Sequence, residues 1–181
     1  NSTVYKFQTG GPDGDLGSNE ILLSSSNECY LGILDGSGVL CDPKGLDKDE
    51  LLRLAHERKM ISEFDISRLS NNGFFVPVDA MDIMLPNGTI VANGTTFRNT
   101  FHTQIFKFVD HIDIFVPCGG RPNSITLNNL HYFVDEKTGK CKIPYIVEGA
   151  NLFITQPAKN ALEEHGCVLF KDASANKGGV T

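Results

Sequence analysis

A glycine-rich turn near the amino terminus constrains the fold of this chain more than any other feature. An apolar strand is predicted over 4–9, and the segment 10–17 that follows contains four glycines and leads into a helix. A second apolar strand, over 30–34, ends at Asp35. Strand, glycine turn, helix, strand and acid in this order are typical of a dinucleotide-binding fold.

Each part of this arrangement has a physical task. At Gly14 the missing side chain lets backbone N–H groups approach a pyrophosphate, and at Gly17 it lets the helix pack against the strand. The helix N-terminus offers unpaired N–H groups and a partial positive charge. The Asp35 carboxylate can accept both hydroxyls of an adenosine ribose, and it would repel the 2′-phosphate of NADP. For the turn alone, a tight strand-to-helix connection without a ligand is the alternative interpretation.

The turn departs from the usual G-x-G-x-x-G pattern. Pro12 stands at the position of the first glycine. We therefore expect Gly10 and Gly11 to form the sharp turn instead, one or two residues earlier in the chain.

Composition and charge exclude several classes of protein. A chain of 181 residues fits one domain, and its net charge of −6 argues against a nucleic-acid partner, which needs basic surface. No apolar run is long enough to span a membrane, and no signal peptide is visible. We expect a protein that is not secreted and that works in the cytoplasm or the mitochondrial matrix.

The cysteines, histidines and basic residues predict no metal site. The five cysteines are odd in number and lack C-x-x-C spacing, so neither a disulfide framework nor a zinc site is expected. Cys29, Cys118 and Cys167 lie in or beside apolar runs and are expected to be small buried hydrophobic residues. The histidines have no mutual spacing and are expected to be surface or helix residues. The cluster of Arg53, Arg58 and Lys59 is expected on a solvated helix face.

Apolar segments alternate with helical patterns along the chain, which predicts an α/β fold. We expect a doubly wound Rossmann-type sheet with helices on both faces, formed by one domain over 1–181. A small hairpin and helix elaboration is expected at about 60–108, with strands 82–85 and 89–91 and a helix over 95–105. The remaining expected strands are 112–116, 145–148 and 167–170, and the remaining expected helices are 17–25, 48–59, 126–134 and 157–165.

Several motifs, taken together, resemble a known family. The segments 146–151 and 175–180 are similar to the nucleotide-binding half of glutamate dehydrogenases, a family that also contains leucine, phenylalanine and valine dehydrogenases. The segments 9–21 and 117–123 resemble the large NAD-specific glutamate dehydrogenases of fungi and some other microbes. The resemblance covers nearly the whole chain and is weakest in the elaboration.

The resemblance implies that the cofactor is bound by Gly14, Asp15, Leu16, Gly17, Asp35, Cys118, Gly119, Asn151 and Asn176. The first four match the pyrophosphate turn, and Asp35 matches the position of the adenosine ribose. Cys118 and Gly119 match small residues that border the cofactor. Asn151 matches a contact on the nicotinamide side, and Asn176 matches a contact near the carboxamide and the bound amino acid. Asp15 departs from the asparagine of smaller members, so a backbone contact is expected there.

The family reaction that the resemblance implies is the oxidative deamination of L-glutamate to 2-oxoglutarate and ammonia, with NAD as cofactor. The catalytic lysine and aspartate of the family lie in a separate substrate domain, to which no segment of this chain is similar. We therefore expect an excised NAD-binding domain without catalytic residues or metal, inactive alone and homo-oligomeric when full length. The alternatives are a domain of another amino-acid dehydrogenase or a non-catalytic nucleotide-binding regulatory module.

Overall fold

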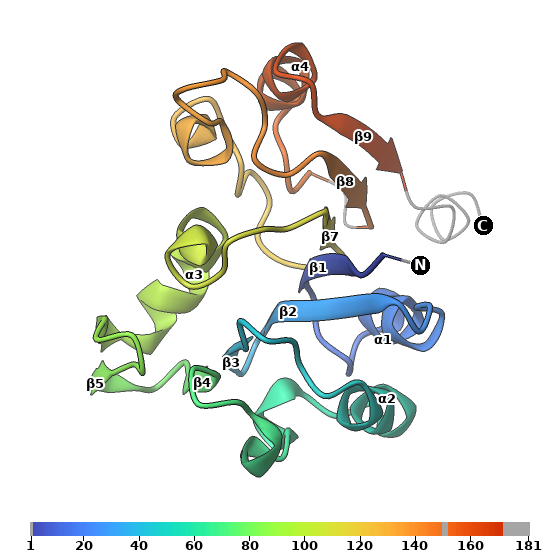
Figure 1. Ribbon diagram of the computed structural model, residues 1–181, viewed down its shortest axis with the longest axis vertical. Coiled ribbons are helices and arrows are strands. Elements are labelled where there is room, and N and C mark those ends of the chain that lie inside the picture. Colours follow the sequence, from blue (N-terminus) through green and yellow to red (C-terminus); the bar gives the residue numbers. More distant parts are fainter. Residues whose placement is uncertain (1, 150–151, 172–181) are drawn as a thin grey trace.

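A seven-stranded sheet runs through the centre of the molecule (Figure 1). The computed structural model describes residues 2–149 and 152–171. In them the strands have the order β4-β3-β2-β1-β7-β8-β9. Their bounds are Val4–Thr9 for β1, Glu28–Asp35 for β2, Gly38–Cys41 for β3, Phe74–Pro77 for β4, Ile114–Pro117 for β7, Tyr145–Glu148 for β8 and Val168–Lys171 for β9.

Five strands of the sheet are parallel. β1 pairs with β2 on one side and with β7 on the other, and β8 and β9 continue the parallel order beyond β7. The carboxyl ends of β1, β2, β7 and β8 therefore meet at one edge of the sheet. The strand order reverses between β2 and β7, which makes the end of β1 a topological switch point, where open α/β sheets bind ligands. The predicted strands of this parallel part are confirmed.

The edge beyond β2 differs from a fully parallel sheet. β3 is antiparallel to β2, and β4 is antiparallel to β3. The sequence predicts a turn and a short extended piece over 36–45, and it assigns 74–77 to the elaboration. In the structure part of that elaboration is thus a strand of the central sheet. All four residues of β3 are buried, because a strand lies on each side of it and helices cover the sheet.

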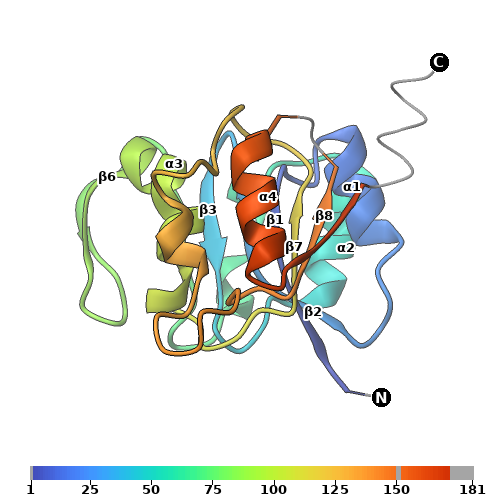
Figure 2. The same ribbon diagram turned by 90° about the horizontal axis from the view of Figure 1, so that it is seen from above.

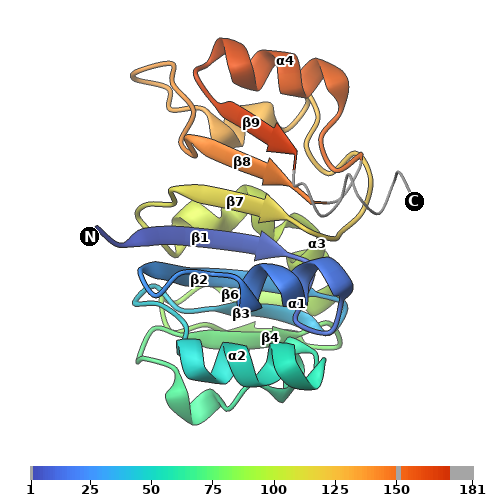
Figure 3. The same cartoon turned by 90° about the vertical axis from the view of Figure 1, so that its right-hand side faces the viewer.

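Helices cover both faces of the sheet, as predicted for a doubly wound fold. α1 (Asp15–Leu22) and α2 (Lys48–Glu57) lie on one face, and α3 (Gly94–Gln104) lies behind the sheet in Figure 3. α4 (Gln156–Glu164) packs into the same apolar cluster as α3. α2 begins where the sequence predicts, and Asp47 caps it: the Asp47 carboxylate accepts the Glu50 N–H at 3.0 Å.

Aromatic packing holds α3 beneath the parallel strands. Phe7 of β1 stacks on Phe115 of β7 with ring centroids 4.8 Å apart, and Phe101 of α3 meets Phe7 edge to face at 6.0 Å. Phe97 lies one turn earlier on the same side of α3 and also contacts Phe101. The apolar side of the helix predicted over 95–105 thus faces the sheet. Arg98 and His102, which directly follow Phe97 and Phe101 along α3, therefore lie beside the carboxyl ends of β1 and β2.

Another part of the elaboration forms a separate hairpin. β5 (Met81–Met84) and β6 (Ile90–Asn93) form their own two-stranded antiparallel sheet, close to the predicted bounds. In Figure 2 this segment extends to one side of the central sheet. In the part of the chain that the structure describes, no helix combines the length and the apolar character needed to cross a membrane.

The helix predicted over 126–134 is wrong for most of its length. A 3₁₀ helix at Leu130–Phe133 is present instead. The Asn129 side chain accepts the Thr126 N–H at 2.8 Å and donates to the Ser124 carbonyl oxygen at 2.8 Å. Short polar side chains that bond to nearby backbone compete with the helical hydrogen bonds, and here they replace the first turn.

Candidate functional site

The turn between β1 and α1 is built from glycines that the fold itself requires. Gly10 has a φ of +89°, and a Cβ on it would lie 2.6 Å from the Gly119 nitrogen. A Cβ on Gly17 would lie 2.1 Å from the Gly11 carbonyl oxygen, so α1 can approach the turn only with glycine there. The buried Gln8 side chain donates to the carbonyl oxygens of Gly10 and Gly17, at 2.8 and 3.2 Å. The sharp turn therefore lies at Gly10 and Gly11, as predicted.

Gly14 differs from these glycines. It is exposed, its φ is −89°, and a Cβ on it would lie 3.7 Å from the nearest protein atom, which is ordinary contact. It is also the N-cap of α1, and it provides no side-chain hydrogen bond to the first helical amides. Nothing in the protein requires glycine here, while open space in front of uncapped amides suits an anion.

The first residues of α1 complete the turn. Leu16 is half-buried. The Asp15 side chain is 90% exposed and accepts a hydrogen bond from Arg58 at 2.8 Å. Arg58 ends α2 in the left-handed conformation, with a φ of 54°. It is thus paired with the carboxylate beside the turn, in addition to lying on the solvated face that the sequence predicts. The side chain of Asp15 is therefore engaged in an ion pair.

Asp35 lies at the end of β2 beside the glycine turn, but its carboxylate is buried. The residue is 3% exposed. Its Oδ1 accepts the Ser37 N–H at 2.7 Å and the Ser37 hydroxyl at 2.5 Å, and its Oδ2 accepts the Ile61 N–H at 2.8 Å. Burial raises the pKa of Asp35, while these hydrogen bonds oppose the rise. The carboxylate thus already accepts three hydrogen bonds from the protein, and Gly11 packs against its Oδ2. With about four lone-pair positions it could accept about one more, fewer than the two ribose hydroxyls that the sequence predicts.

The loop after β7 is fastened to the end of β1. The Cys118 and Gly119 N–H groups both donate to the Thr9 carbonyl oxygen, at 2.7 and 3.0 Å, and the Thr9 hydroxyl donates back to the Gly119 carbonyl oxygen. Cys118 is buried. The structure therefore brings the glycine turn, Asp35, Cys118 and Gly119 to one edge of the sheet. Asn151 and Asn176 lie outside the described residues.

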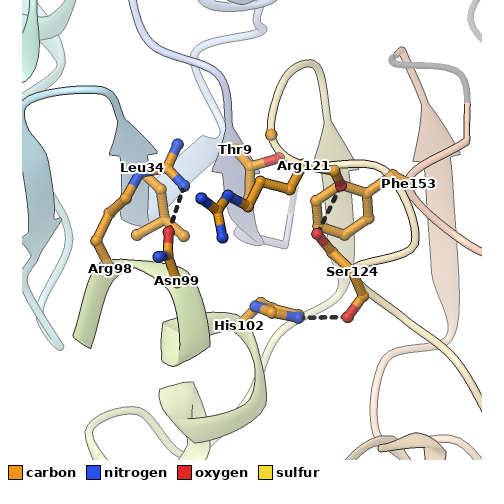
Figure 4. Close-up of a pocket in the computed structure, with 9 residues that line it drawn as sticks. Thr9, Leu34, Arg98, Asn99, His102, Arg121, Ser124 and Phe153 are labelled. Carbon is orange, nitrogen blue, oxygen red and sulfur yellow. Dashed lines mark hydrogen bonds between the residues drawn. The ribbon is translucent and has the colours of Figure 1, made fainter. Parts of the chain in front are cut away.

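A pocket opens beside this edge, between α3 and the loop that follows β7 (Figure 4). It is lined by Thr9, Leu34, Arg98, Asn99, His102, Gly120, Arg121, Ser124 and Phe153. In Figure 4 the guanidinium groups of Arg98 and Arg121 point into the same space. The Arg98 Nε–H donates to the Asp35 carbonyl oxygen at 2.8 Å, which connects the pocket to the end of β2.

The pocket carries the positive charge of two guanidinium groups, those of Arg98 and Arg121. Within the described residues, no ion pair includes Arg98 or Arg121. Burial and the neighbouring Arg121 lower the pKa of Arg98, and Asp35 opposes this. His102 is 6% exposed, and burial lowers its pKa. Its Nε2 lies 2.7 Å from the Ser124 carbonyl oxygen, so the neutral ring donates there.

Sequence reasoning did not include Arg98, Arg121 or Arg58 in the site. A signal for Arg98 is present, because Arg98 and His102 are four residues apart and follow the apolar positions Phe97 and Phe101 around the predicted helix. Arg121 follows the Gly-Gly pair after β7 and has no such signal. Its approach to Arg98 depends on the folding of two distant segments.

Comparison with known proteins agrees with this architecture. A model of the Glutamate/Leucine/Phenylalanine/Valine dehydrogenase family matches residues 2–181. The NAD-specific glutamate dehydrogenase of Saccharomyces cerevisiae is 95% identical over 181 residues, which are 100% of this chain and 17% of that protein. The NAD-specific glutamate dehydrogenase of Neurospora crassa is 63% identical over 180 residues, which are 99% of this chain and 16% of that protein.

A solved structure resembles the fold at much lower sequence identity. The crystal structure of Plasmodium falciparum glutamate dehydrogenase superposes with a TM-score of 0.58 at 18% identity, covering 97% of this chain and 31% of that one. The chain spans about one sixth of the length of the curated relatives it matches (17% and 16%). With its whole described sheet matched by the family model, the chain belongs to the Glutamate/Leucine/Phenylalanine/Valine dehydrogenase family.

Proposed function

We propose that this chain is the NAD-binding domain of an NAD-specific glutamate dehydrogenase, which deaminates L-glutamate oxidatively to 2-oxoglutarate and ammonia. The observation that carries the proposal is Gly14, a glycine that no described protein atom requires, placed at the uncapped start of α1. The same turn also contains Gly11, which packs against Asp35. The names of the relatives in Saccharomyces cerevisiae and Neurospora crassa support both the cofactor and the substrate.

The residues at the carboxyl edge suit the three parts of the cofactor. The first amides of α1 would hold the pyrophosphate, which needs the space in front of Gly14. The end of β2 beside Asp35 would take the adenosine ribose, and the adjoining pocket of Arg98 and Arg121 would add positive charge for the phosphates of the cofactor. The nicotinamide would then lie toward β7 and β8, near Cys118 and Gly119 and near the family positions of Asn151 and Asn176. NAD supplies the hydride acceptor when bound, and these residues bind and orient it.

The catalytic lysine and aspartate would come from a substrate domain elsewhere in the same polypeptide. We propose that this domain closes over the carboxyl edge, brings glutamate to the nicotinamide and excludes water. A homo-oligomer is proposed for the full-length enzyme by resemblance to the family. The buried, hydrogen-bonded Asp35 keeps negative charge near the ribose position, which favours NAD over NADP.

Calorimetric titration of the purified protein with NAD and with NADP tests the proposal. NAD should bind more tightly by roughly tenfold to a hundredfold, which corresponds to about 1–3 kcal/mol for like charges near a partly buried site. Gly14→Val should abolish binding of both cofactors and leave the far-UV dichroism unchanged, because the protein itself has room for a Cβ. Unchanged NAD binding by Gly14→Val would show that the turn does not hold the pyrophosphate.

A further inference from the structure

Two cysteines that are distant in the sequence lie together at the β9 end of the molecule. Cys141 follows the loop after the 3₁₀ helix, and Cys167 directly precedes β9, a strand that lies beside α4 in Figure 1. The Cys141 N–H donates to the His165 carbonyl oxygen at 2.9 Å. The Leu162 carbonyl oxygen, at the end of α4, accepts both the Cys167 N–H at 2.9 Å and the Cys141 thiol at 3.4 Å. Both cysteines thus converge on one carbonyl group.

The shared acceptor places the Cys141 sulfur beside the backbone of Cys167. Cys141 is half-buried, so a small oxidant can reach it, whereas Cys167 is only 4% exposed. The neighbouring Cys167 thiol lowers the pKa of Cys141, against the effect of burial. The same contact and burial raise the pKa of Cys167. The thiolate, which is the nucleophile in thiol chemistry, therefore forms on the more accessible cysteine of the pair.

We propose that Cys141 and Cys167 are an oxidation site, which hydrogen peroxide or another hydroperoxide converts to a reversible disulfide. This goes beyond cofactor binding and does not depend on it. The sequence alone does not suggest the pair, because its members are separated by β8 and α4 and lack the short spacing of redox motifs.

The reaction proceeds in two steps. The Cys141 thiolate attacks one peroxide oxygen, so an S–O bond forms, the O–O bond breaks, and the leaving oxygen takes up a proton to give water or an alcohol. The sulfur of Cys141 is now a sulfenic acid. The Cys167 sulfur then attacks it, so the S–S bond forms, the S–O bond breaks and hydroxide leaves as water with the Cys167 proton. Both thiols are oxidised and the peroxide is reduced.

The disulfide would join three elements at this end of the sheet. Cys141 forms a backbone bridge with Val134, and Cys167 continues into β9, which pairs with β8. A bond between them would tie the loop over 134–141 to the last turn of α4 and to the start of β9. A dithiol reductant should reduce this disulfide without unfolding the protein, because both cysteines are free thiols in the folded structure.

Peptide mapping after peroxide treatment tests the proposal directly. Cleavage after glutamate separates the peptide 137–148, which contains Cys141, from the peptide that begins at residue 165 and contains Cys167. After blocking of free thiols with iodoacetamide, mass spectrometry should find these two peptides linked in the oxidised protein and separate after dithiothreitol. Linked peptide should form about tenfold faster than oxidation of Cys29, a half-buried cysteine that serves as the internal control.

Variants separate this outcome from the others. Cys141→Ser and Cys167→Ser should each abolish the linked peptide, and Cys29→Ser should leave it unchanged. Cys141 over-oxidised without a link, a link only between two copies of the chain, or Cys29 oxidised as fast as Cys141 would each overturn the proposal. Because every variant is compared for far-UV dichroism before oxidation, loss of the link through unfolding is detected separately.

Discussion

Two regions of the molecule differ in how their positive charges are paired: Lys6 in the middle of β1, and the arginines near the carboxyl end of that strand. Lys6 is 1% exposed, and its Nζ lies 2.5 Å from Glu20 of α1 and 2.7 Å from Glu28 of β2. Arg98 and Arg121 share a pocket, and no carboxylate of the described residues pairs with either.

A charge that is paired inside the protein contributes to stability, whereas a charge without a protein partner is available to a ligand. A buried cation without a partner costs several kcal/mol, so Lys6 is compatible with folding because its glutamates are close. Two guanidinium groups that face each other repel, and an anion or an electron-rich ring between them would relieve that repulsion. The ion pairs of Lys6 with Glu20 and Glu28 therefore stabilise the fold, whereas the pocket of Arg98 and Arg121 is suited to bind an anionic or aromatic ligand.

Lys6→Met should produce the largest effect. It leaves Glu20 and Glu28 without their buried partner, and the free energy of unfolding should fall by about 3–5 kcal/mol. Urea unfolding followed by dichroism measures the change. The variant Lys6→Met/Glu20→Gln/Glu28→Gln is the matched control and should recover part of the loss, since it removes the unpaired charges. A loss below about 1 kcal/mol, the range of exposed pairs, would contradict a structural role.

Acid should remove part of the same stabilisation. Burial opposes the ionised form of Glu28, but the hydrogen bonds from Lys6 and Ser25 outweigh it and lower the pKa of Glu28 below its ordinary value of 4.5. The folded protein thus holds the Glu28 proton less tightly than the unfolded chain does. The contribution of Glu28 is present above pH 4.5 and is lost as the pH falls through the lower folded-state pKa. Glu28→Gln should flatten the acid limb of a stability profile, and an unchanged limb would contradict this assignment.

Arg121→Gln should separate binding from stability. NAD affinity should fall by about tenfold, or about 1.4 kcal/mol, because the pocket loses one guanidinium group. The free energy of unfolding should stay within about 0.5 kcal/mol, because Arg121 is an exposed residue outside any ion pair of the described chain. Calorimetry and urea unfolding on the same preparation test both statements. A lower free energy of unfolding with unchanged NAD affinity would mean that Arg121 stabilises the fold rather than binding the cofactor.

Asp15→Asn should have the smallest effect. Its ion pair with Arg58 is exposed on both sides, so stability should change by less than about 1 kcal/mol. Removing the carboxylate beside the turn should tighten NAD binding by a few fold, because an anion no longer faces the pyrophosphate and Arg58 is released. Titration at low and high salt checks this, since a charge effect of this kind shrinks with ionic strength. Weaker binding would mean that the Asp15 side chain itself contacts the cofactor.

Local patterns predict much of this fold from the sequence. The strand bounds of β1 and β8 agree with the predicted 4–9 and 145–148, and the cap at Asp47 begins α2 where expected. These features depend on neighbouring residues, because apolar runs, turn glycines and capping side chains act within a few positions of each other. The glycine turn and Asp35 are found together for the same reason, since short connections keep them adjacent.

The sequence by itself thus determined the fold family, the glycine turn after β1 and the parallel strands, because each depends on residues that are close together in the chain. Only the tertiary structure decided that 74–77 joins the central sheet through β3, that Asp35 is buried against Ile61, and that Arg98 meets Arg121. It also placed Cys141 beside Cys167, at the shared carbonyl group of Leu162. Each of these contacts joins segments that are distant along the chain, and their approach follows from the packing of the whole sheet and its helices rather than from any local preference.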